Sequence, residues 1–167
     1  MTQQDKPVWF ITGCSTGFGR ELARATLERG YRTVVTARKA ADIADLAKGH
    51  EGRALIQTLD VAKPDQIAAS VVAAEAKFGQ IDVLVNNAGI GYFAAIEESD
   101  DDEVRRMFEI NFWGLANMTR AALPGMRQRR SGHIVNISSM GGVRGAPAVG
   151  YYNATKFALE GDRKAHV

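Results

Sequence analysis

Short apolar runs rich in β-branched residues alternate with longer helical patterns along this chain. Five such runs predict strands, at Val8–Thr12, Thr33–Ala37, Ala54–Thr58, Val83–Asn86 and His133–Ile137. Continuous apolar runs of this length, separated by helices, are typical of strands that are buried on both faces of a parallel sheet. The pattern therefore predicts an α/β fold built from βαβ units.

Two helical stretches in the first half of the chain have recognisable ends. The first begins near Gly19 and stops at Gly30, a residue type that commonly follows the last turn of a helix. The next begins after Pro64, because proline suits the first turn of a helix but not its interior. Its apolar stripe is expected to lie on the sheet and contains Ile67, Val71, Ala74 and Phe78.

The longest predicted helix is a single one, from about Asp101 to about Arg127. Ser99 is expected to cap its start. Asn111 falls on the apolar face of this helix, seven residues after Val104. A buried amide without partners costs about 1–3 kcal/mol. Asn111 is therefore expected to be either a core residue with satisfied hydrogen bonds or part of a polar site.

A glycine-containing loop connects the first predicted strand to the first predicted helix. It reads Thr12-Gly13-Cys14-Ser15-Thr16-Gly17-Phe18-Gly19. Glycines allow a tight turn and a close approach of the backbone to a ligand, and the free N–H groups of a helix N-terminus attract a pyrophosphate. The order of strand, glycines and helix predicts a dinucleotide site that includes Gly13, Ser15, Thr16, Gly17, Phe18 and Gly19.

The end of the second predicted strand indicates which dinucleotide is bound. An NAD-binding fold carries an acidic residue about 20 residues after the glycines, whereas this chain reads Thr36-Ala37-Arg38-Lys39. Because a guanidinium can grip a 2′-phosphate, NADP(H) is favoured over NAD(H), although both cations also suit a solvated loop. Asp60, after the third predicted strand, is placed either to accept from the adenine amino group or to cap the next helix.

Composition and charge exclude several other functions. The 167 residues are 46% hydrophobic and 24% charged, which suits one domain over residues 1–167. With 21 basic and 19 acidic residues, the net charge of +2 gives no reason to expect nucleic acid or an anionic membrane as a partner. The lone Cys14 leaves no intrachain disulfide, and no apolar run suits a signal or membrane segment. We expect a cytoplasmic protein without a metal site.

A tyrosine and a lysine near the end of the chain suggest a reaction. Tyr152 and Lys156 stand four residues apart, so a helix projects both from one face. An ammonium beside a phenol favours the phenolate, and such a tyrosine can exchange a proton with an alcohol or carbonyl oxygen. Ser139, after the fifth predicted strand, can hold that oxygen for hydride transfer.

Five motifs in the same order resemble the short-chain dehydrogenase/reductase family. They are the loop 12–19, Asn86-Asn87-Ala88-Gly89, Asn111, Ser139 and Tyr152-Asn153-Ala154-Thr155-Lys156. The match runs from Val8 to about Gly161. The resemblance implies a Rossmann-like, doubly wound parallel sheet in the order 3-2-1-4-5. It also implies NADP(H)-dependent interconversion of a secondary alcohol and a ketone or aldehyde, with a small molecule as substrate.

The same resemblance implies roles for single residues. Tyr152 would be the general acid or base, Lys156 would bind the nicotinamide ribose and favour the phenolate, and Ser139 would hold the substrate oxygen. Asn111 would anchor a water that relays protons between Lys156 and solvent. The remaining residues expected at the cofactor are Arg38, Asp60, Val61, Asn87, Ala88 and Gly89.

Two neighbours of the catalytic motif are less suitable for these roles. Ser138 is set aside because the family places its serine about thirteen residues before the tyrosine, and Tyr151 has Thr155 rather than lysine four residues later. Apolar residues near the motif suggest a lipophilic substrate, although core packing explains them nearly as well. They are Gly91, Tyr92, Phe93, Met140, Val143, Ala146 and Val149.

The sequence stops eleven residues after Lys156, whereas members of the family continue into further strands and a segment that closes over the substrate. Residues 161–167 lack an apolar face that would continue a helix. We expect a fold without the family's C-terminal strands, an unpaired edge at the fifth strand and a tendency to form a homo-oligomer. The alternatives are a catalytically silent dinucleotide-binding protein, and an enzyme that uses the same site for dehydration or epimerisation.

Overall fold

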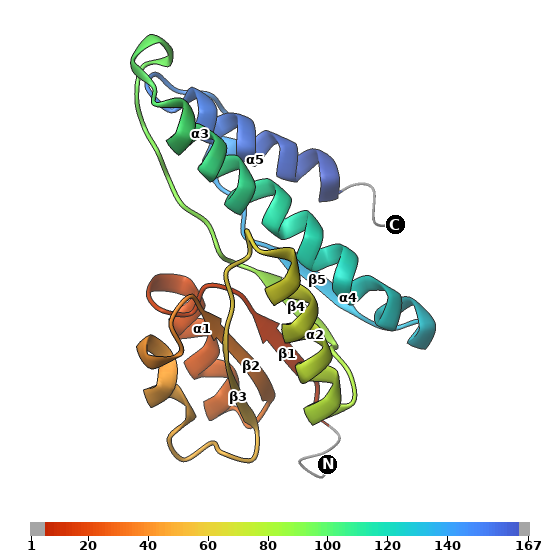
Figure 1. The fold of residues 1–167 in the computed structure, drawn as a ribbon. Helices are drawn as coiled ribbons and strands as arrows, with labels where there is room; N and C mark the ends of the chain where they lie inside the picture. Colours follow the sequence, from red (N-terminus) through yellow and green to blue (C-terminus); the bar gives the residue numbers. More distant parts are fainter. Residues whose placement is uncertain (1–5, 164–167) are drawn as a thin grey trace.

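The computed structural model describes the backbone of residues 6–163 and the side chains of residues 6–161. Its centre is a parallel five-stranded sheet in the order β3-β2-β1-β4-β5 (Figure 1). The strand order confirms the prediction, and each strand begins and ends within one residue of its expected bounds. The strands are β1 (Val8–Ile11), β2 (Arg32–Ala37), β3 (Ala54–Thr58), β4 (Val83–Asn86) and β5 (His133–Asn136).

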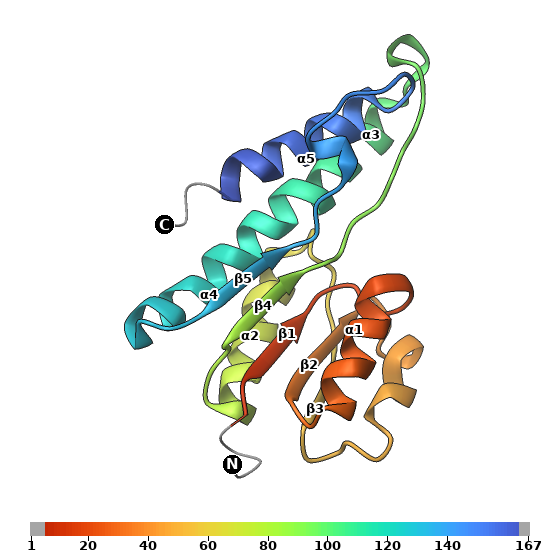
Figure 2. The same ribbon diagram turned by 180° about the vertical axis from the view of Figure 1, so that it is seen from behind.

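Helices cover both faces of this sheet (Figures 1 and 2). One face carries α1 (Gly17–Glu28) and the 3₁₀ segment η2 (Ala40–Ala47). The other carries α2 (Pro64–Phe78) and α4 (Leu115–Arg129), while α3 (Asp101–Phe108) and α5 (Gly150–Arg163) pack against each other beyond the end of the sheet. The connections include two 3₁₀ turns, η3 (Ile96–Glu98) and η5 (Met140–Gly142).

Each face of the sheet has its own apolar core, because successive residues of a strand point to opposite sides. Phe10 and Leu84 lie in the core beneath α2 and α4, whereas Ile11 and Val85 lie in the core beneath α1. The predicted stripe of α2 is confirmed, since all four of its residues belong to the first core: Ile67, Val71, Ala74 and Phe78.

The helix expected from Asp101 to Arg127 is not continuous. A π-helical segment, η4 (Glu109–Gly114), separates α3 from α4, which ends at Arg129. The prediction that Ser99 caps this stretch is also wrong. Asp100 is the cap, and its Oδ1 accepts from the backbone N–H groups of Asp102 (2.9 Å) and Glu103 (3.0 Å). Its carboxylate suits the positive end of the helix better than a hydroxyl does.

β5 forms the open edge of the sheet, as expected. Among the described residues its pairing partner is β4 alone, and Val135 is 40% exposed. The polar end of the chain continues α5 two residues further than expected, from Gly161 to Arg163. Residues 164–167, the rest of the tail predicted to lack helical packing, lie outside the described residues.

The described part of the chain has neither a membrane-spanning helix nor a metal-binding cluster. None of its helices combines the length and the apolar character that a membrane span requires. None of its groups of three or more His, Cys, Asp or Glu side chains is arranged to hold a metal ion.

Candidate active site

The glycine loop leaves β1 and turns sharply into α1. Gly13 and Gly17 both have positive φ, at 71° and 59°, a conformation that glycine adopts without steric cost. A Cβ on Gly13 would lie 2.9 Å from Ala88 Cα, and one on Gly19 would collide with the carbonyl oxygen of Gly13. The first and third glycines of this loop are therefore required by close packing as well as by the turn.

Thr12 and Asn87 bind the glycine loop to the segment after β4. The hydroxyl oxygen of Thr12 accepts from the N–H groups of Asn87 and Ala88, both at 3.0 Å. In return, Nδ2 of Asn87 donates to the carbonyl oxygens of Thr12 (2.9 Å) and Gly13 (3.0 Å). The side chains of Asn87 and Thr12 therefore hold the loop in place together. This structural role of Thr12 was not predicted from the sequence.

A cavity of about 410 Å³ lies at the carboxyl ends of the central strands, the usual ligand position in a doubly wound sheet. It brings together ten residues that were predicted to bind the cofactor: Gly13, Ser15, Thr16, Phe18, Arg38, Asp60, Val61, Asn87, Ala88 and Gly89. Gly17 and Gly19 shape the loop and do not line the cavity. Four lining residues were missed, namely Ala37, Leu59, Ile90 and Ile110, because an aliphatic side chain that lines a cavity looks like a core residue in a sequence.

The residues of this cavity fit a dinucleotide. No side chain caps α1 at Thr16, and its first turn contains no acidic residue, so its N–H groups are free of the side-chain acceptors that would compete with a phosphate. Arg38 lies in the same wall, and in the described part of the chain it forms no salt bridge. The cavity thus joins a positive helix end to a free guanidinium.

Asp60 occupies the cavity wall and does not cap α2, so that alternative is excluded. Its Oδ1 accepts from the N–H of Ala62 at 3.0 Å, while the N-cap position of α2 is Lys63, which has no side-chain cap. The backbone N–H of Asp60 donates to Oε1 of Gln66 at 2.8 Å. Asp60 is therefore fixed in the wall of the cavity, and its contact with adenine remains a prediction.

Tyr152 and Lys156 lie on one face of α5, as their spacing predicts. Nζ of Lys156 is 5.9 Å from the centroid of the Tyr152 ring and donates to the carbonyl oxygen of Ile137 at 2.9 Å. Lys156 is only 7% exposed, and burial lowers the pKa of its ammonium below the usual 10.5. The cation is thus held in the protein over the ring of Tyr152.

Ser139 stands three residues beyond β5, at the start of η5. Its Oγ accepts from the N–H of Gly141 at 3.1 Å, which leaves its own hydrogen available for a ligand. Ser139 lines neither the cavity at the carboxyl ends of the strands nor a second cavity at Tyr152. The hydroxyl of the neighbouring Ser138 is buried without a hydrogen-bond partner among the described residues.

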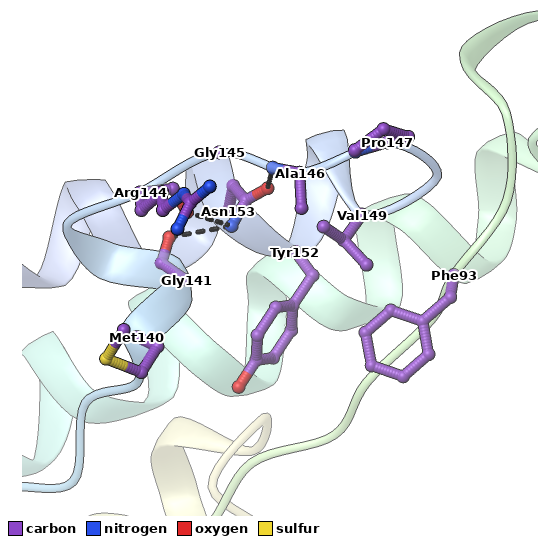
Figure 3. Close-up of a pocket in the computed structure, with 10 residues that line it drawn as sticks. All are labelled: Phe93, Met140, Gly141, Arg144, Gly145, Ala146, Pro147, Val149, Tyr152 and Asn153. Atoms are coloured by element: carbon purple, nitrogen blue, oxygen red, sulfur yellow. Dashed lines mark hydrogen bonds between the residues drawn. The ribbon is translucent and has the colours of Figure 1, made fainter.

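A second cavity, of about 380 Å³, surrounds Tyr152 (Figure 3). Phe93 packs edge-on against the Tyr152 ring, with centroids 5.4 Å apart and planes at 71°. Four of the predicted apolar residues line this cavity, namely Phe93, Met140, Ala146 and Val149, whereas Gly91, Tyr92 and Val143 do not. Tyr151 lies in a different hollow, with residues of α3 and η4, so the structure separates the two adjacent tyrosines.

Asn111 is buried in the π-helical segment and has its hydrogen bonds satisfied, as expected. Its Oδ1 accepts from the N–H of Ile90, and its Nδ2 donates to the carbonyl oxygen of the same residue, both at 2.8 Å. Nδ2 also donates to Oγ1 of Thr155 at 3.2 Å. Both amide donors are occupied, and one acceptor site on Oδ1 remains. The proposed relay water stays a prediction.

Cys14 is a buried turn residue of the glycine loop. Its Sγ donates to the carbonyl oxygen of Ile11 at 3.3 Å, and burial raises the pKa of the thiol to about 12. Since the thiolate is the reactive form of cysteine, burial disfavours a nucleophilic role for this side chain.

Comparisons with known proteins agree with this geometry. The family model for short chain dehydrogenases matches residues 7–165. The chain is 39% identical over 155 residues to a 3-ketodihydrosphingosine reductase of Bacteroides thetaiotaomicron, with 93% of this chain and 55% of that protein covered. Among solved structures, a short-chain dehydrogenase from Streptomyces avermitilis is similar with a TM-score of 0.93 and 41% identity, over 96% of this chain and 59% of that chain.

An actinorhodin polyketide ketoreductase solved with NADPH is also similar, with a TM-score of 0.92 and 35% identity over 99% of this chain and 65% of that chain. The chain spans about half the length of the curated relatives it matches. The matched family model, the sheet order and the relatives lead to one conclusion: the chain belongs to the short-chain dehydrogenase/reductase family of oxidoreductases.

Proposed function

We propose that this protein interconverts a secondary alcohol and a ketone or aldehyde, with NADP(H) as the redox partner. The observation that carries the proposal is the position of the Lys156 ammonium, 5.9 Å from the ring centroid of Tyr152. Tyr152 also lines an open, largely apolar cavity. Tyr152 is therefore a proton donor or acceptor that a bound substrate can reach.

The nicotinamide cofactor, when bound, supplies or accepts the hydride. In this proposal its pyrophosphate is held by the N-terminus of α1 and the glycine loop, and Lys156 binds the nicotinamide ribose. The adenosine side is held by Asp60, Val61 and the segment Asn87–Gly89, whose backbone is fixed by Thr12.

Arg38 would select the phosphorylated cofactor. Its guanidinium lines the cofactor cavity without a salt bridge to a described carboxylate, so it is free to pair with a 2′-phosphate in a bidentate manner. The similarity to a ketoreductase solved with NADPH supports the same preference.

The proton steps would be carried by three side chains. Tyr152 gives its proton to the carbonyl oxygen in reduction, or takes it from the alcohol in oxidation. Ser139 orients that oxygen, because its Oγ already accepts from Gly141 N and its hydrogen remains to donate. The adjacent Lys156 cation favours negative charge on the phenol oxygen while the proton is away.

Asn111 would serve the return of this proton to solvent. Its remaining acceptor site can hold a water, and Thr155 connects it to the catalytic helix. Oγ1 of Thr155 accepts from Asn111 and donates to the carbonyl oxygen of Tyr152 at 2.8 Å.

The substrate in this proposal is lipophilic. Aromatic and aliphatic side chains form much of the cavity around Tyr152, including Phe93, Met140 and Val149, and such walls favour apolar ligands. The similarity to a reductase named for a 3-keto sphingoid lipid supports this choice. We further propose that residues 1–167 form one domain, that the protein is cytoplasmic and that it forms a homo-oligomer.

The test is to measure NADPH consumption by the purified chain with a panel of lipophilic and polar ketones, alongside NADPH binding by fluorescence. We expect saturable binding and stoichiometric consumption, faster with lipophilic ketones. Binding without consumption of any ketone would instead identify a catalytically silent dinucleotide-binding protein. Product formation without net consumption of cofactor would identify dehydration or epimerisation.

A further inference from the structure

The loop that forms one side of the substrate cavity is tied to the residue next to Tyr152. Asn153 is 7% exposed, and its Nδ2 donates to the carbonyl oxygens of Gly141 (2.8 Å) and Arg144 (3.2 Å). Its Oδ1 accepts from the N–H of Ala146 at 3.3 Å (Figure 3). Three hydrogen bonds from one side chain therefore fix the backbone on both sides of Arg144.

Arg144 is the charged residue in an otherwise neutral cavity. The other nine residues that line the cavity around Tyr152 are apolar, glycine, tyrosine or asparagine. Arg144 is exposed and forms no salt bridge with a described residue. Figure 3 shows it across Tyr152 from Phe93. The cavity thus has an aromatic side chain, Phe93, packed against the Tyr152 ring, and a guanidinium without a described salt bridge on the side of Gly141 and Asn153.

This distribution of charge suits a substrate with two chemically different parts. An apolar body would cover Phe93 and Val149, and would exclude water from the cavity as it enters. A guanidinium recognises a carboxylate by its geometry, since it presents two parallel donors to the two oxygens. A neutral substrate would leave the same guanidinium without a partner.

We propose that Arg144 is a specificity-determining residue that binds a carboxylate on the substrate, so that the preferred substrates are apolar keto acids and hydroxy acids. This inference rests on the proposed function, because it assumes that Tyr152 marks the reacting carbon. Asn153 acts as a positioning residue that holds the backbone of Arg144 at a fixed distance from Tyr152.

The experiment compares aryl keto acids with their methyl esters, which keep the apolar body and remove the charge. The spacer between ketone and carboxylate is varied in a short series, and kcat/KM is measured at saturating NADPH. We expect the best acid to exceed its ester by about tenfold, the effect of a charge-assisted contact that is open to solvent. Arg144→Gln should reduce this ratio to about one, and Arg144→Lys should keep part of it.

A matched control separates this contact from a general effect of charge. Arg120 lies on α4, is exposed and donates to Asn117 Oδ1 at 3.1 Å, so Arg120→Gln should leave the ratio of acid to ester unchanged. The preference of the native protein should also weaken as KCl is added, because Arg144 is open to solvent.

Three outcomes would overturn the inference, and each differs from a failure of the proposed function. Equal kcat/KM for the acids and their esters would show that Arg144 does not bind the substrate carboxylate. If Arg144→Gln binds NADPH more weakly but keeps the preference for acids, then Arg144 binds the cofactor and not the substrate carboxylate. If neither the keto acid nor its methyl ester is turned over, the binding of each to the NADPH-loaded protein is compared by calorimetry. Equal binding there would overturn the inference independently of catalysis.

Discussion

Asn111 and Ile90 exchange two hydrogen bonds of 2.8 Å, one in each direction, between the π-helical segment and the loop after β4. This is the pattern of two paired strand residues, reproduced by a side-chain amide. These two hydrogen bonds join the π-helical segment to the loop that contains Ala88 and Gly89. They therefore help to fix one wall of the cofactor cavity.

We expect Asn111→Asp to destabilise the protein by about 2–4 kcal/mol. The substitution replaces two donors by acceptors, so a buried carboxylate would face the carbonyl oxygen of Ile90. Urea denaturation measures the effect. Asn117→Asp is the control, because Oδ1 of Asn117 accepts from Arg120 and a carboxylate keeps that bond. Equal stability of the two variants would contradict the role assigned to Asn111.

Gly19→Ala should reduce both stability and NADPH binding. A Cβ there would collide with Gly13 O and with the amide of Asn87 that holds the loop. Overpacking of this kind costs about 1–3 kcal/mol. Gly52→Ala is the matched control, since nothing lies within 4 Å of the Cβ it would add. Fluorescence titration with NADPH and urea denaturation provide the two readouts, and native behaviour of Gly19→Ala would refute the close packing described here.

Arg38→Gln should weaken NADPH binding by about ten- to hundredfold, which is the effect of losing a charge-assisted hydrogen bond. Binding of NADH should hardly change, since NADH lacks the 2′-phosphate. The measurement is the dissociation constants of NADPH and NADH for the native protein and the variant. If the native protein binds NADH as tightly as NADPH, Arg38 does not select the 2′-phosphate.

The sequence predicted those parts of the molecule that depend on local pattern. All five strands appear where apolar and β-branched residues gather in short runs between helical patterns. The loop 12–19 contains both its turn glycines and several residues that line the cavity in one stretch. Tyr152 and Lys156 meet because a helix places residues four apart on one face.

The incorrect predictions concern features that local pattern does not encode. A π-helical segment is a rare interruption that occurs mostly as a single turn inside an α-helix, so the pattern around residues 109–114 was interpreted as one continuous helix. Ser99 and Asp100 are both good caps, but in the structure the hydroxyl of Ser99 donates to the carbonyl oxygen of Ala95 at 2.8 Å, and Asp100 caps the helix. Ile90 and Ile110 reach the cofactor cavity through contacts between distant segments, which no single stretch of sequence reveals.

Lys156→Met should change the pH dependence of stability in a defined direction. Burial lowers the pKa of Lys156 in the folded chain, so between that pKa and 10.5 the unfolded chain binds more protons and stability rises with pH. Below the pKa that Lys156 has in the folded chain, the native protein bears the full free-energy cost of burying the ammonium. The stability of Lys156→Met relative to the native protein should therefore decrease as the pH is raised from neutral to about 10.

Lys48→Met is the control for the loss of one positive charge, because Lys48 is exposed. Urea denaturation of the native protein and both variants is compared at each pH. If the difference between Lys156→Met and the native protein does not change with pH, or changes in the opposite direction, the ammonium is not penalised by its surroundings.

The proton-transfer role of Tyr152 is tested most directly by comparing Tyr152→Phe with Tyr151→Phe. Turnover of a lipophilic ketone and NADPH binding by fluorescence are measured on both variants. We predict that Tyr152→Phe lowers kcat by about 10²–10⁴-fold with NADPH binding retained, and that Tyr151→Phe, in the hollow beside α3, keeps native turnover. Native turnover by Tyr152→Phe would contradict the central claim.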